Sequence, residues 1–305
     1  MNNAADNKIK KHICVGLLAH VDAGKTTLAE AMLYTCGKLR SPGRVDHKDA
    51  FLDNFSIERE RGITIFSKQA QIEWGGEAVT LLDTPGHVDF CAEMERTLHV
   101  LDAAVLIVSG TDGVQSHTET LWRLLERYKL PTFIFVNKMD REGTDREALL
   151  RNIQSRLDIR AVDFSDLINT GGEDADEKAD YASRLGTGAL ENIALCDEAI
   201  MEKYLESGRL SDDDIISLTA ERKLFPCFFG SALKLEGVEG LLDGIAHFAP
   251  VPEYGEEFGA RVFKITRDNA GNRLTHMKLT GGSLNANQMV SNAMSACNDD
   301  EVWEE

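Results

Sequence analysis

The residues best suited to chemistry form a short loop with the sequence AHVDAGKT at residues 19–26. An apolar run precedes this loop and apolar residues at helical spacing follow it, so the loop should join a buried strand to a helix. Backbone N–H groups in such a loop surround a phosphate, Lys25 reaches the outer phosphates and the Thr26 hydroxyl ligates Mg²⁺. The strict pattern opens with Gly, whereas this chain has Ala19. The nucleotide-binding residues predicted here are His20, Val21, Asp22, Ala23, Gly24, Lys25, Thr26 and Thr27.

A second motif, LDTPG at residues 82–86, closes another apolar run. A carboxylate and a backbone amide at the end of a neighbouring strand would meet the phosphates held by the first loop. We expect Asp83 to hold Mg²⁺ through water and the Gly86 N–H to detect the γ-phosphate.

A third motif, NKMD at residues 137–140, predicts which base the site selects. The Asp140 carboxylate can accept hydrogen bonds from guanine N1–H and from the exocyclic amine, and adenine offers neither donor. An unpaired buried carboxylate is costly, so the motif indicates guanine and disfavours an ATPase or a kinase. The predicted base-binding residues are Asn137, Lys138 and Asp140, with backbone N–H groups of Ser231, Ala232 and Leu233 facing the guanine oxygen.

Apolar strands and helical segments alternate along the chain. Helices are expected between the strands, with capping boxes formed by Ser116 with Glu119 and by Thr144 with Glu147. This alternation is typical of an α/β protein whose doubly wound, mostly parallel sheet is covered on both faces, and it matches a P-loop NTPase fold. Strands are expected at residues 12–18, 66–74 (an edge strand), 78–82, 103–108, 131–136 and 225–229.

The pattern changes to strands alone beyond Pro252, with a hairpin expected from two strands at residues 258–267 and 274–280. We therefore predict a GTP-binding domain at residues 1–252 and the beginning of an all-β barrel domain at residues 253–305. About 50 residues are too few for a closed barrel, so the chain is expected to stop inside that domain. Residues 285–298 have weak strand patterning and are predicted to be poorly ordered.

The chain of 305 residues has a formal net charge of −18, and much of this charge lies in one segment. Residues 158–221 hold 17 Asp and Glu against five Lys and Arg, and we interpret them as an acidic insertion at the rim of the sheet. This acidity argues against binding to free nucleic acid or to an anionic membrane, and no apolar run approaches the length of a membrane span. Six scattered cysteines without a CxxC pair favour reduced thiols in a cytoplasmic protein.

These motifs together resemble the translational GTPases of the elongation factor G branch, and within that branch the tetracycline-resistance ribosomal protection proteins. The resemblance covers residues 12–282 or so. The matching stretches are residues 19–27, 58–65, 83–87, 137–140 and 230–232.

The resemblance implies several roles that the residues alone do not establish. It implies that the Thr64 hydroxyl ligates Mg²⁺ while the γ-phosphate is present, and that His87 positions the attacking water beside an apolar gate of Val21 and Ile63. Thr64, His87 and Lys25 are thus the catalytic residues expected, with Thr26, Thr64 and Asp83 holding the metal. It also implies GTP and GDP as ligands, the ribosome as activating partner and a monomeric protein. The remaining histidines show no ligand spacing.

Two functions remain open at this point. The first is a ribosome-dependent GTPase of the ribosomal protection or elongation factor G type. The second is a truncated GTP-binding module without ribosomal activity of its own. The choice between drug resistance and translocation cannot be read from these residues.

Overall fold

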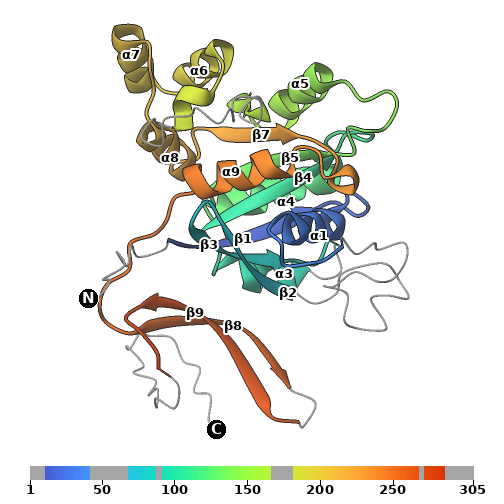
Figure 1. The fold of residues 1–305 in the computed structure, drawn as a ribbon, viewed down its shortest axis with the longest axis vertical. Coiled ribbons are helices and arrows are strands. Elements are labelled where there is room, and N and C mark those ends of the chain that lie inside the picture. Colours follow the sequence, from blue (N-terminus) through green and yellow to red (C-terminus); the bar gives the residue numbers. More distant parts are fainter. Residues whose placement is uncertain (1–10, 42–67, 87–90, 166–180, 268–270, 286–305) are drawn as a thin grey trace, which may run out of the picture.

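A seven-stranded sheet with the order β2-β3-β1-β4-β5-β7-β6 is the main element of the protein (Figure 1). The computed structural model describes residues 11–41, 68–86, 91–165, 181–267 and 271–285. Every neighbouring pair of strands is parallel except β2 and β3, which pair antiparallel at one edge. The predicted fold class, with an edge strand before β3, is therefore confirmed. The strands are β1 (His12–Ala19), β2 (Lys68–Trp74), β3 (Glu77–Asp83), β4 (Ala103–Ser109), β5 (Thr132–Asn137), β6 (Ala161–Asp163) and β7 (Phe225–Phe229).

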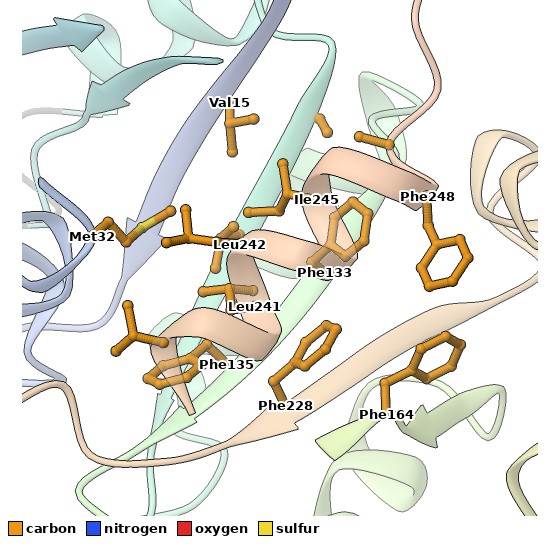
Figure 2. Close-up of a cluster of buried hydrophobic side chains, with 14 of the residues drawn as sticks. Val15, Met32, Phe133, Phe135, Phe164, Phe228, Leu241, Leu242, Ile245 and Phe248 are labelled. Carbon is orange, nitrogen blue, oxygen red and sulfur yellow. The ribbon is translucent and has the colours of Figure 1, made fainter. Parts of the chain in front are cut away.

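The central strands are buried on both faces, which explains their nearly continuous apolar sequences. Successive residues of β1 join opposite cores: Val15 and Leu17 pack on one side of the sheet, and Leu18 packs on the other. Figure 2 shows the first core, in which the Phe133 and Phe135 rings of β5 lie beside apolar side chains of α9 (Val238–Phe248).

The helices form layers on both faces of the sheet. Among the described residues, no helix is both long and apolar enough to cross a membrane. Helices α1 (Lys25–Thr35) and α9 cover one face, with α8 (Asp212–Ala220) beside α9, and helices α3 (Cys91–Leu98), α4 (Ser116–Arg127) and α5 (Arg146–Arg156) cover the other.

Two helices begin with caps other than those predicted. Helix α5 is capped by Asp145, whose carboxylate accepts from the Ala148 N–H at 2.9 Å, while Thr144 donates to the Met139 carbonyl at 3.0 Å. Helix α4 is preceded by Gln115, whose N–H lies 3.3 Å from Thr118 Oγ1. Both expected capping boxes are thus wrong by one residue, because several polar residues adjoin each helix start and only the path of the chain selects between them.

The acidic segment at residues 158–221 contributes to the sheet and to its core. Strand β6 lies within it and pairs parallel with β7, and Phe164 is fully buried in the first core. Helix α8 packs on α9. In contrast, α6 (Thr187–Ala194) and α7 (Glu198–Ser207) lie at the edge of the fold, and α7 has no buried residue (Figure 1).

An antiparallel hairpin of β8 (Gly259–Arg267) and β9 (Arg273–Gly281) follows, as expected for the start of a β domain. The Lys278 ammonium of β9 is paired with the Asp102 carboxylate and donates to the Val100 carbonyl at 3.0 Å. Asp102 also accepts from the Cys14 N–H of β1 at 2.8 Å. The hairpin is therefore joined to the sheet through a buried carboxylate.

Candidate nucleotide-binding site

The loop between β1 and α1 has the conformation that its sequence predicts. Its turn is closed by a 3.1 Å hydrogen bond from the Ala23 N–H to the His20 carbonyl. Asp22 and Gly24 are left-handed, with φ of 63° and 90°, and α1 begins directly afterwards at Lys25. A Cβ on residue 24 would lie 2.3 Å from Asn137 Nδ2, so only glycine fits there.

The end of β3 lies directly against this loop. The Lys25 ammonium forms an ion pair with the Asp83 carboxylate, and these side chains are only 7% and 1% exposed. The Thr84 hydroxyl donates to the Leu17 carbonyl of β1 at 2.7 Å, which fixes the chain after β3. A Cβ on Gly86 would come within 3.2 Å of the Ala19 carbonyl oxygen. Residues from two separate motifs thus meet at one edge of the sheet.

Asn137 joins three parts of the site. Its Nδ2 donates to the Ala23 carbonyl at 2.9 Å, and its Oδ1 accepts from the Ala232 and Lys138 N–H groups at 2.9 and 2.8 Å. The side chain is almost fully buried. Its bonds position the phosphate-binding loop, the NKMD motif and the segment after β7 relative to one another, a role that the sequence motif does not reveal.

Asp140 is held ionised beside this junction. A hydrogen bond from Ser231 lowers the pKa of the Asp140 carboxyl; partial burial opposes this shift, and the charges of Lys234 and Arg141 support it. Ser231 is itself buried, and the Met139 N–H donates to the neighbouring Gly230 carbonyl at 3.0 Å. An ionised carboxylate at this place can accept two N–H donors from one face of a base.

The loop after β4 adds residues that no motif predicted. Asp112 accepts from the hydroxyls of Ser109 and Thr111 at 2.6 and 2.9 Å, and these bonds lower the pKa of its carboxyl. Lys138 and His20 act on Asp112 electrostatically in the same direction. His117, in the first turn of α4, lies beside His20. The only sequence signal for these residues is their place after a buried strand.

Several predicted residues lie outside the described ranges. They include Thr64 and His87, so their catalytic assignment stays a prediction, as does that of the gate residue Ile63. The expectation of poor order at residues 285–298 falls almost entirely outside them as well. The four cysteines whose side chains are described (Cys14, Cys36, Cys196 and Cys227) are free thiols.

The residues present fit a magnesium nucleotide. Among the described residues, no group of three or more His, Cys, Asp or Glu side chains could hold a metal ion by itself. Mg²⁺ bound to a nucleotide does not require such a cage, because phosphate oxygens and water complete its octahedron around one or two protein ligands. The Thr26 hydroxyl at the start of α1 and the Asp83 carboxylate beside Lys25 provide that smaller donor set.

Several known proteins resemble this chain along most of its length. The family model for the elongation factor Tu GTP-binding domain matches residues 10–251. Elongation factor G from Ureaplasma urealyticum serovar 10 is 34% identical in a match that covers 91% of this chain and 48% of that protein. Tetracycline resistance protein TetP from Clostridium perfringens is 36% identical in a match that covers 92% of this chain and 44% of that protein.

A crystal structure of a protein from Thermus thermophilus has a TM-score of 0.76 and 29% identity, covering 89% of this chain and 46% of that chain. The chain spans about half the length of the relatives that it matches. It belongs to the elongation factor Tu GTP-binding domain family of translational GTPases.

Proposed function

We propose that this chain binds GTP and GDP with Mg²⁺ and hydrolyses GTP as the nucleotide-binding module of a ribosomal translation factor. The observation that carries the proposal is the convergence of Lys25, Asp83, Asn137 and Asp140 at one edge of the sheet, around a left-handed loop at the start of α1. Parallel α/β sheets bind phosphates at this edge.

Each part of the nucleotide has a proposed partner. Lys25 exchanges its bond with Asp83 for bonds to the outer phosphates. Thr26 and Asp83 then hold the Mg²⁺ ion. The Asp140 carboxylate accepts the N1–H and exocyclic amine of guanine, and the aliphatic stem of Lys138 lies beside the base. The ionised state of Asp140 supports this assignment, since a neutral carboxyl would lose one acceptor.

The proposed reaction transfers the γ-phosphoryl group to water, mainly through positioning and charge stabilisation. Mg²⁺, when bound, neutralises charge that develops on the phosphate oxygens. Lys25 contributes a buried positive charge at the same phosphates, Gly86 donates its N–H to the γ-phosphate, and Thr64 completes the metal site. His87 orients the water. The roles of Thr64 and His87 follow from the family resemblance.

We propose the ribosome as partner and a cytoplasmic, monomeric protein, because two of the relatives are named elongation factor G and tetracycline resistance protein. The ribosomal protection type and the elongation factor G type both fit these names. A second candidate, which the same nucleotide-binding site would serve equally well, is a GTP-binding module without ribosomal activity of its own.

The test measures nucleotide binding and turnover with GTP, with ATP as competitor, with and without purified ribosomes. We expect binding selective for guanine nucleotides and turnover that ribosomes stimulate. Asp140→Asn should weaken GDP binding about 10- to 100-fold, because bonds to a charged acceptor are lost. Equal competition by ATP would refute guanine selection, and selective binding without ribosomal stimulation would favour the second candidate.

A further inference from the structure

Two histidines meet at the phosphate-binding loop: His20 lies within the loop, and His117 belongs to none of the motifs. His20 Nδ1 and His117 Nδ1 are 3.4 Å apart although 97 residues separate them in sequence. The two rings meet edge to face, with centroids 5.5 Å apart. The His20 carbonyl accepts from the Ala23 N–H, so the residue that carries this imidazole also closes the turn of the loop.

The loop needs support from its surroundings to keep its shape. Asp22 has a φ of 63°, which is uncommon for a residue with a Cβ. Backbone in such a conformation persists when neighbouring groups hold it. Asn137 holds one end of the turn through the Ala23 carbonyl, and the His117 imidazole is in position to hold the other end through His20.

His117 stands on a rigid part of the fold. The Val114 N–H, just before α4, donates to Asn152 Oδ1 of α5 at 2.9 Å. Glu119 in the first turns of α4 is paired with Arg156 of α5 at 2.6 Å, and Val114 and Thr118 are buried. A group attached to this anchored turn can therefore fix a loop that it contacts.

The chemistry of the pair requires one donor and one acceptor. Two Nδ1 atoms at this distance cannot both carry a hydrogen. One Nδ1–H therefore donates to the other Nδ1, and the contact forms with either histidine as the donor.

We propose that His117 is a positioning residue of the phosphate-binding loop, which it holds in its nucleotide-binding conformation through the His20 imidazole. The inference rests on the proposed nucleotide-binding function. In this role His117 acts on the loop and not on the nucleotide, so its loss should affect how well the loop is preorganised and leave the bonds to the nucleotide in place. Removal of one neutral hydrogen bond should weaken nucleotide binding by about two- to tenfold.

The test compares two substitutions in the 305-residue chain. His117→Phe keeps an aromatic ring and removes the nitrogen, whereas His117→Asn places an amide, which can accept or donate a hydrogen bond, near the former Nδ1. With fluorescent GDP as probe, we expect about two- to tenfold weaker binding for His117→Phe and recovery toward wild-type affinity for His117→Asn. His99→Phe is the matched control, because its ring packs on Tyr128, and its affinity should equal that of the wild type.

A spectroscopic measurement tests the contact itself. Imidazole ¹⁵N shifts of the wild-type chain should show that one of the two facing Nδ1 atoms carries a hydrogen and the other does not, and His117→Phe should move the His20 signal. Unchanged GDP affinity in a folded His117→Phe chain, or a His20 imidazole signal that stays the same in that variant, would overturn the inference alone. A wild-type chain without guanine nucleotide binding would overturn the proposed function and this inference with it.

Discussion

Glycine at position 24 satisfies two independent requirements of the phosphate-binding loop. Its φ of 90° is left-handed, and an added Cβ would lie 2.3 Å from Asn137 Nδ2. The Asn137 amide cannot move aside freely, because it bonds to the Ala23 carbonyl and to the Ala232 N–H. A side chain at position 24 would therefore disturb the loop and the base-binding segment together.

We expect Gly24→Ala to weaken GDP binding at least about tenfold and to lower the free energy of unfolding by about 2–3 kcal/mol, from backbone strain and steric overlap together. Fluorescent GDP titration and urea unfolding measure these effects. Gly37→Ala is the matched control, since Gly37 is also left-handed, with a φ of 71°, but nothing lies within 4 Å of its Cβ. It should cost only about 1 kcal/mol and leave GDP affinity unchanged. Equal effects in both variants would contradict the role assigned to Asn137.

The motif residues could be predicted because each motif is local and follows a buried strand, and parallel strands bring their carboxyl ends to one edge. The meeting of Lys25 and Asp83 follows from that rule. The His20 contact with His117 does not, because a single histidine in a helix has no spacing to recognise and the contact depends on how α4 lies on the sheet. The bonds of Asn137 likewise depend on the order of the strands.

Among the strands, those that are buried along their whole length could be predicted best from the sequence. Strands β4 and β5 are buried along their whole length and stand out as apolar runs. Strand β6 has only three residues and is defined by pairing with β7 more than 60 residues later, so periodicity could not detect it. The segment assigned to an acidic insertion therefore contains an edge strand of the sheet.

The joint between hairpin and sheet yields a prediction for Lys278. Burial opposes its charge, but the bond and the attraction to Asp102 outweigh burial and raise the pKa of the ammonium. Lys278→Met would leave the buried Asp102 carboxylate with bonds from Cys14 and Tyr254 only, so we expect a loss of about 2 kcal/mol in urea unfolding. Adding Asp102→Asn to the Lys278→Met variant should recover part of that loss in stability.

Arg151→Met provides the comparison, because its bond to Glu147 joins side chains that are 68% and 84% exposed. It should cost at most about 0.5 kcal/mol. A raised pKa means that the contribution of Lys278 to stability is complete below the unfolded pKa of about 10.4 and is lost only as the pH rises through the folded pKa. The difference between Lys278→Met and wild type should therefore stay constant from about pH 6 to about pH 9, and a large change in this window would contradict the assignment.

At the scale of the whole molecule, nucleotide binding and folding should be linked. The loop, the NKMD motif and the segment after β7 come from strands across the sheet, so the site exists only when the sheet is folded. A ligand that binds only the folded chain adds about 2.7 kcal/mol at a concentration about one hundred times its dissociation constant. For a chain of 305 residues this corresponds to a rise of about 4 °C in melting temperature.

We expect this rise with GDP and none with ADP at the same concentration. In Asp140→Asn, the roughly 10- to 100-fold weaker affinity should remove from about half to most of the rise, and scanning calorimetry measures all three. Because the Lys278–Asp102 pair joins the hairpin to β1 and β4, heat should unfold the hairpin and the sheet in one transition that GDP shifts as a unit. Two transitions, of which GDP moves only one, would show that the hairpin is thermodynamically independent of the sheet. If the wild-type chain unfolds in a single GDP-dependent transition and Lys278→Met unfolds in two, the Lys278–Asp102 ion pair couples the hairpin to the sheet.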